Sequence, residues 1–82
     1  MSTTPKKVKI YSTDTCGYCK MAKNFFDTNK VAYEALDVGH DKVAREEMVT
    51  KSGQMGVPVI DIDGEIIIGF DQPKIKKKLG LA

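Results

Sequence analysis

The stretch TCGYCK, residues 15–20, contains both cysteines of the chain, Cys16 and Cys19, with two residues between them. A C-x-x-C pair can be a redox dithiol, half of a metal site, or two core residues that happen to be close. What flanks the pair decides among these interpretations. Thiol reactivity depends on the position relative to a helix, and a metal site needs further ligands.

The residues on either side of the pair predict a strand and then a helix. Residues 7–11 alternate apolar with charged side chains and lead into a run of turn and cap formers, which predicts a strand. Apolar side chains then recur at helical spacing over residues 17–30, which predicts a helix with Asp14 or Thr15 as its N-cap. The apolar members are Tyr18, Met21, Ala22, Phe25 and Phe26. The cysteines therefore lie at a strand-to-helix junction.

The next segment predicts a second strand and a second helix. Residues 31–38 alternate enough for a strand, and residues 39–41 can cap a helix over 41–52. Ser52 and Gly53 are a helix-ending pair. We expect the inward side chains of this helix to be Val43, Ala44 and Met48.

A hairpin and a short helix complete the chain. Residues 57–62 and 65–68 flank Asp63 and Gly64, and Asp-Gly between apolar runs is a strong hairpin signal. Two antiparallel strands are therefore expected here. After residues 69–71 a last helix follows, with apolar positions at Ile75 and Leu79.

The element order is β-α-β-α-β-β-α, which indicates an α/β fold. Two strands joined by a helix are parallel with a right-handed crossover, and the hairpin adds an antiparallel pair. We predict a four-stranded mixed sheet flanked by three helices. Residues 1–82 contain no repeat, linker or low-complexity segment, so a single domain is expected.

Composition limits the partners and the compartment. The net charge of +2 is too small to indicate a nucleic-acid partner, and no run approaches the roughly 20 apolar residues of a membrane span. The first residues lack the apolar core of a signal peptide, so we expect a cytoplasmic protein, and a monomer. In a reducing compartment a lone cysteine pair is more often catalytic or metal-binding than a structural disulfide.

The position of the cysteines favours redox chemistry. Residues three apart on a helix share a face, so the two sulfurs can reach bonding distance. A helix N-terminus offers unpaired N–H groups and partial positive charge, which favour a thiolate at Cys16, nearest the end and the surface. Cys19, one turn further in, is then the resolving thiol. Structural zinc takes four ligands, and the chain offers these two cysteines and His40, so no metal site is expected.

Pro58 is the second unusual position. Proline cannot donate a hydrogen bond to a sheet, so at the start of a strand it marks an edge or a special bend. A cis peptide before it is one candidate, and an ordinary proline at the start of a strand is the alternative.

Taken together, these motifs resemble the glutaredoxins over nearly the whole chain, from about Val8 to Leu79. The features are the C-x-x-C at the first helix, the Gly-Gln-Met-Gly-Val-Pro stretch, the Asp-Gly hairpin and the Gly-Phe-Asp turn. The resemblance implies a thioredoxin fold with Pro58 in cis beside the Cys16 sulfur. It also implies that the main chain of Val57 pairs with substrate like an added β-strand.

The sequence departs from the glutathione-dependent glutaredoxins at several positions. Gly17 stands where those proteins carry proline, Thr13 where they carry lysine, and Gly56 where they carry threonine. The short Gly-Phe-Asp turn is more similar to small glutaredoxin-like redoxins of the NrdH and YruB types. By resemblance, the substrate-binding residues are Thr13, Gly17, Tyr18, Gln54, Val57, Pro58, Gly69, Phe70 and Asp71.

The resemblance implies a thiol–disulfide oxidoreductase that reduces protein or small-molecule disulfides through Cys16 and Cys19. It implies no permanently bound cofactor, with either glutathione or thioredoxin reductase as the electron donor. The alternative is an iron–sulfur carrier, in which Cys16 thiolates of two chains and two glutathiones hold a 2Fe–2S cluster. Gly17 favours this alternative, because cluster-binding relatives share it, whereas the resolving thiol Cys19 opposes it.

Overall fold

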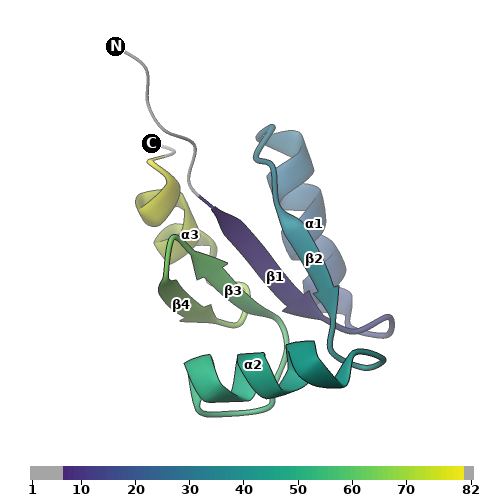
Figure 1. Cartoon of the computed structure of the whole chain (residues 1–82). Helices are drawn as coiled ribbons and strands as arrows, with labels where there is room; N and C mark the ends of the chain where they lie inside the picture. Colours follow the sequence, from purple (N-terminus) through teal and green to yellow (C-terminus); the bar gives the residue numbers. More distant parts are fainter. Residues whose placement is uncertain (1–6, 81–82) are drawn as a thin grey trace.

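The computed structural model describes residues 7–80 and contains one four-stranded sheet with the strand order β2-β1-β3-β4 (Figure 1). The elements along the chain are β1 (Val8–Ser12), α1 (Gly17–Thr28), β2 (Glu34–Asp37), α2 (Lys42–Ser52), β3 (Val59–Ile62), β4 (Glu65–Ile68) and α3 (Gln72–Leu79). β1 pairs in parallel with β2 and antiparallel with β3, which pairs antiparallel with β4. The predicted fold class, a mixed thioredoxin-type sheet with three helices, is confirmed.

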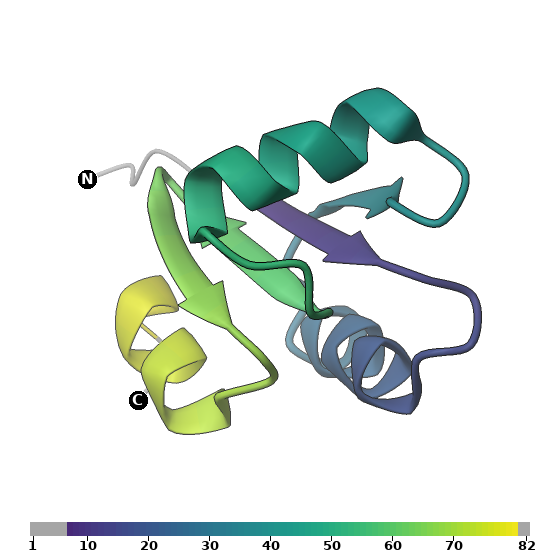
Figure 2. The ribbon, with the colours of Figure 1, turned by 90° about the horizontal axis from the view of Figure 1, so that it is seen from below.

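The helices cover both faces of the sheet. Figure 2 shows α2 along one face and α1 and α3 along the other. β3 is buried at all of its residues because it lies inside the sheet with a helix layer on each side. Its side chains alternate, with Ile60 and Ile62 in the cluster under α1 and α3, and Val59 in the cluster under α2.

Two predicted chain reversals are present. Asp63 and Gly64 both have positive φ, 55° and 93°, as the tight turn of a two-residue hairpin requires. Gly53 ends α2 in the left-handed conformation with φ of 73°, and its N–H donates to the Val49 carbonyl. The first of these turns joins β3 to β4, and the second ends α2 before the chain enters β3.

Some predicted details are wrong. Val43 is 74% exposed, because the buried stripe of α2 is set by Ala44 and Met48, one turn apart, which turns Val43 outward. The second strand is shorter than residues 31–38, and the first helix ends at Thr28 rather than Lys30. β3 begins only at Val59, because Pro58 has no N–H to donate to the sheet.

None of the helices within residues 7–80 is both long and apolar enough to cross a bilayer.

Candidate active site

Cys16 is the N-cap residue of α1. Its backbone is extended, with φ of −86° and ψ of 113°, and its sulfur accepts a hydrogen bond from the Cys19 N–H at 3.1 Å. The prediction of Asp14 or Thr15 as N-cap is therefore wrong. Cysteine is outside the usual set of capping residues, but its sulfur accepts the N–H that a serine hydroxyl or an aspartate would otherwise accept.

The two thiols lie in different environments. Both are free, Cys16 is partly exposed, and Cys19 is fully buried in the first turn of α1. Burial, together with the hydrogen bond to the Cys16 sulfur, raises the pKa of the Cys19 thiol to about 11. The pair therefore combines one accessible sulfur on a helix N-terminus with one protonated, sheltered thiol.

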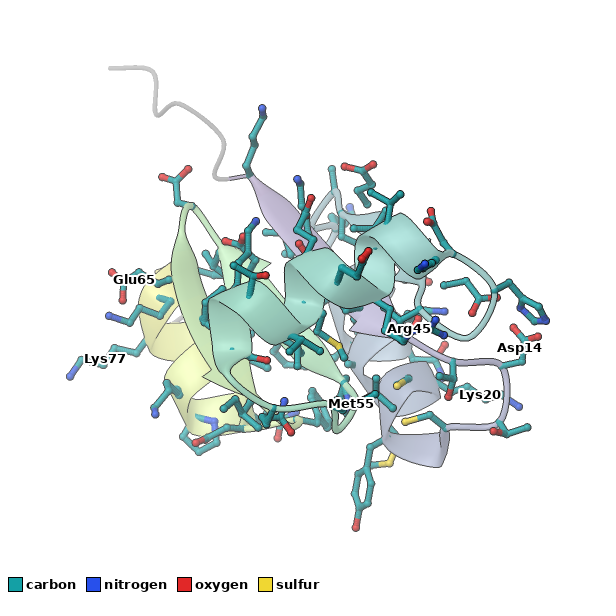
Figure 3. The ribbon with its side chains drawn as sticks, turned by 60° about the horizontal axis from the view of Figure 1, so that its bottom comes forward. Asp14, Lys20, Arg45, Met55, Glu65 and Lys77 are labelled. Carbon is teal, nitrogen blue, oxygen red and sulfur yellow. The ribbon has the colours of Figure 1, made fainter. Side chains whose placement is uncertain are left out.

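The surface around Cys16 is apolar on the helix side. Gly17, Tyr18 and Met21 line a shallow depression, and Tyr18 and Met21 are 66% and 52% exposed. Figure 3 shows Asp14 and Lys20 projecting outward at the end of the molecule where α1 begins. The predicted residues Gly17 and Tyr18 thus lie directly beside the cysteines, on an accessible surface.

The segment that ends in Pro58 presents one open main-chain residue. The peptide bond between Val57 and Pro58 is cis, and Pro58 is buried. The Pro58 carbonyl accepts a hydrogen bond from the Gly69 N–H at 2.8 Å. Val57 is partly exposed, and its N–H and C=O make no hydrogen bond to another main-chain group within residues 7–80. Of the two alternatives that the sequence left open at Pro58, the structure has the cis peptide bond, and this bond lies just before the interior strand β3.

The turn at residues 69–71 has structural contacts of its own. The Asp71 carboxylate caps α3 by accepting a hydrogen bond from the Lys74 N–H at 3.3 Å. Phe70 packs edge-on against Phe25 of α1, with ring centroids 5.8 Å apart. The bond from Gly69 to Pro58 connects this turn to the Val57 segment.

Thr13 and Gln54 occupy two different loops. Thr13 is partly buried in the loop between β1 and α1, and its carbonyl accepts a hydrogen bond from the Cys16 N–H at 3.4 Å. Gln54 lies after α2, and its side chain turns back onto its own loop to bond with Gly56. Thr13 is therefore connected directly to the cysteine loop, and Gln54 to the Val57 segment.

A cluster of possible metal ligands that the sequence analysis missed lies beside the cysteine loop. One ligand atom each from Asp14, Asp37 and His40 falls within 4.8 Å of the others. His40 Nδ1 is 2.7 Å from Asp37 Oδ2, and this hydrogen bond raises the pKa of His40 and lowers that of Asp37. The i,i+3 spacing of Asp37 and His40 is the only signal in the sequence that could have indicated the pair. Asp14 and His40 are exposed and Asp37 is partly buried, and the contacts of His40 with the two carboxylates account for their proximity.

The fold and the site together define a class of proteins: thioredoxin-fold proteins that carry a cysteine pair at the start of the first helix. A model of the glutaredoxin family matches residues 8–67, so the chain belongs to the glutaredoxin family. Family and fold together support a thiol–disulfide oxidoreductase-like role.

Several individual proteins are similar to this chain. A glutaredoxin-like 8.6 kDa protein in the rubredoxin operon of Clostridium pasteurianum is 46% identical over 70 residues, covering 85% of this chain and 93% of its own. Glutaredoxin 3 of Escherichia coli K12 is 39% identical over 64 residues, covering 78% of this chain and 77% of its own. The crystal structure of the thioredoxin-like protein BC3987 superposes with a TM-score of 0.85 at 34% identity, covering 89% of this chain and 100% of its own.

Proposed function

We propose that this protein reduces disulfides through a Cys16–Cys19 dithiol. The Cys16 thiolate attacks one sulfur of the substrate disulfide, the substrate S–S bond breaks, and the leaving thiolate takes up a proton. The Cys19 sulfur then gives up its proton and attacks Cys16 in the resulting mixed disulfide. The second substrate thiol leaves, and the Cys16–Cys19 disulfide remains. Two electrons pass to the substrate, and an external thiol reductant must restore the dithiol.

One observation carries the proposal: the Cys16 sulfur accepts the Cys19 N–H at the N-terminus of α1. A hydrogen bond and a helix terminus both favour the charged form of the group that receives them, and the thiolate is the attacking species. The partial exposure of Cys16 gives a substrate disulfide access to it.

The environment of Cys19 suits the second step. Its pKa of about 11 has burial as the larger cause and the Cys16 hydrogen bond as the second. A Cys16 sulfur bonded to substrate is a weaker hydrogen-bond acceptor, so this second cause is reduced in the mixed disulfide. Deprotonation of Cys19 therefore becomes easier at the stage when its attack is needed.

We further propose that substrate lies along the Val57 segment. In an antiparallel hydrogen-bonded pair, two residues exchange both of their N–H···O=C bonds, and Val57 has both groups available. The residues proposed to bind substrate are Thr13, Gly17, Tyr18, Gln54, Val57, Pro58, Gly69, Phe70 and Asp71. Protein disulfides are the proposed substrates, with glutathione or thioredoxin reductase as the electron donor.

Serine substitutions test the roles of the two cysteines. Cys16→Ser should abolish reduction of a protein disulfide, whereas Cys19→Ser should accumulate the mixed disulfide, which is detectable as a mass adduct. Thr50→Ala, an exposed change on α2 away from the cysteine pair, serves as the control for handling and folding. Full activity of the Cys16→Ser protein would contradict the proposal.

A parallel assay identifies the electron donor. NADPH consumption is followed with the same protein disulfide in two mixtures, one with glutathione and glutathione reductase, the other with thioredoxin reductase. Turnover in only one mixture assigns the donor, and turnover in neither rejects both.

A further inference from the structure

The side chain of Gln54 is occupied by its own loop. Its Oε1 accepts the Gly56 N–H at 2.7 Å, and its Nε2 donates to the Gly56 carbonyl at 3.1 Å. The second Nε2 hydrogen can reach the Ser52 Oγ, 3.4 Å away. If the oxygen and nitrogen of the Gln54 side-chain amide were exchanged, the amide NH2 would face the Gly56 N–H, and two donors would meet. The hydrogen bonds therefore fix the orientation of the Gln54 amide. Gln54 therefore satisfies both main-chain groups of Gly56 at once.

Ser52 joins this arrangement to the end of α2. Its Oγ lies 2.7 Å from the Met48 carbonyl and 2.9 Å from the Gln54 carbonyl, and its single hydrogen can serve either of them. The loop is thus held from the last turn of α2 through Ser52 and Gln54 to Gly56. At its other end, the Pro58 carbonyl is held by Gly69.

Val57 lies between Gly56, which is held by Gln54, and the Pro58 carbonyl, which is held by Gly69. Its own N–H and C=O have no hydrogen-bond partner within residues 7–80. A segment that is ordered before binding loses less conformational entropy when it pairs with a substrate. Resting on the proposed function, we infer that Gln54 is a positioning residue: it holds the main chain of Gly56 so that Val57 presents its N–H and C=O to a peptide disulfide.

The structure also explains why residue 56 is glycine in this arrangement. A Cβ at position 56 would lie 2.7 Å from Gln54 Oε1, and the next nearest heavy atom is Gln54 Cδ at 3.8 Å. Alanine at this position therefore displaces the flexible Gln54 side chain and little else. Gly56→Ala and Gln54→Ala should remove the same two hydrogen bonds, so their effects should coincide instead of adding.

A double-mutant cycle with two substrates tests the inference. For a disulfide-linked peptide dimer, Gln54→Ala and Gly56→Ala should each raise KM by about 3- to 10-fold, the effect of one or two lost hydrogen bonds, with kcat unchanged. The double variant should match the single ones. With 2-hydroxyethyl disulfide, which lacks peptide groups to pair with Val57, the rise in KM should be smaller than with the peptide dimer in every variant. The alkylation rate of Cys16 should be unchanged, because none of the substitutions contacts the cysteines. Thr50→Ala, an exposed change on α2, is the matched control.

A direct readout accompanies the kinetics: exchange of the Gly56 amide hydrogen should be faster in Gln54→Ala than in the wild type. An unchanged KM in Gln54→Ala, or additive effects of the two substitutions, would overturn the inference. A wild-type protein that reduces neither disulfide would instead overturn the proposed function, while the exchange rate would still report on the Gln54–Gly56 contact.

Discussion

Cys16 and Cys19 are one helical turn apart, yet their sulfurs have opposite surroundings. Cys16 is partly exposed and receives an N–H from the helix, whereas Cys19 is enclosed among buried side chains. Burial penalises the charged form of a thiol, and an N–H bond to sulfur favours it. The fold therefore separates the two sulfurs chemically although they are close in space.

This separation predicts selective alkylation. At neutral pH, one equivalent of iodoacetamide should modify Cys16 at least about tenfold faster than Cys19, because thiolates react and Cys19 has a pKa of about 11. Mass spectrometry of digested protein measures both rates. In Cys16→Ser the remaining thiol, Cys19, should still react slowly, since burial is the larger cause of its raised pKa. Equal rates at the two cysteines would contradict the assignment.

The pair formed by Asp37 and His40 predicts a titration. The hydrogen bond to Asp37 raises the pKa of His40, with Asp14 adding to the effect, while the bond from His40 lowers the pKa of Asp37. The contact between His40 and Asp37 therefore stabilises the fold fully at pH values between the ordinary pKa of an aspartate and the ordinary pKa of a histidine. It is lost as pH rises through the raised value of His40 and as pH falls through the lowered value of Asp37.

Chemical-shift titration of the His40 ring measures this effect. Asp37→Asn should return the His40 pKa close to its ordinary value of about 6.5, whereas Asp14→Asn should lower it by less. An unchanged His40 titration in Asp37→Asn would show that the hydrogen bond is absent in solution.

At the scale of the elements, local signals in the sequence were sufficient where one residue type has a unique backbone role. Asp63 with Gly64 predicted the hairpin turn, and Gly53 the end of α2, because positive φ restricts the choice of residue. The start of α1 was less predictable. Cys16 occupies the capping position, and cap preferences derive from oxygen acceptors, so Asp14 and Thr15 were the stronger local candidates.

The candidate site was predictable in composition but not in its internal contacts. The C-x-x-C spacing located Cys16 and Cys19, and the Val57-Pro58 pair indicated a docking segment by resemblance. The bonds from Gln54 to Gly56 depend on how a flexible side chain folds over its own loop, which no periodicity encodes. The proximity of Asp14 to His40 depends on two loops meeting beyond the ends of β1 and β2.

The N-cap of α2 predicts a measurable loss of stability. Asp41 Oδ1 accepts a hydrogen bond from the Ala44 N–H at 3.1 Å, so one of the unpaired N–H groups of the helix start is satisfied. Asp41→Ala should lower the free energy of unfolding by about 1 kcal/mol, while Asp41→Ser should recover most of it. Urea denaturation with Lys42→Ala as the neighbouring exposed control measures the difference. Equal losses for alanine and serine would argue against capping.

At the scale of the whole molecule, a polar network joins α2 to the sheet. Tyr11, fully buried on β1, donates to the Glu47 carboxylate, and Lys51 donates to Asp61 at 2.8 Å and to the Tyr11 hydroxyl at 3.3 Å. The other Asp61 oxygen accepts the Gly64 N–H at 2.8 Å. Asp61 thus ties the interior strand β3 to both α2 and the hairpin turn. The helix that leads into the Val57 segment is thereby fixed on its face of the sheet.

Substitutions at Asp61 should separate these two connections. Asp61→Ala leaves the Gly64 N–H without its partner and removes the shortest polar contact of Lys51, which keeps its contacts with Tyr11 and Glu47. It should lower the free energy of unfolding by about 2–3 kcal/mol. Asp61→Asn keeps an acceptor for the Gly64 N–H and weakens only the contact with the partly exposed Lys51, so a loss of about 1 kcal/mol is expected. Lys51→Met in the Asp61→Asn background should add a further loss of less than about 1 kcal/mol, because only the weaker contacts of Lys51 with Tyr11 and Glu47 remain to be removed. Urea denaturation of the four proteins tests this order. Equal losses in Asp61→Asn and Asp61→Ala would mean that the charge of Asp61, rather than its bond to the hairpin turn, accounts for the stabilisation.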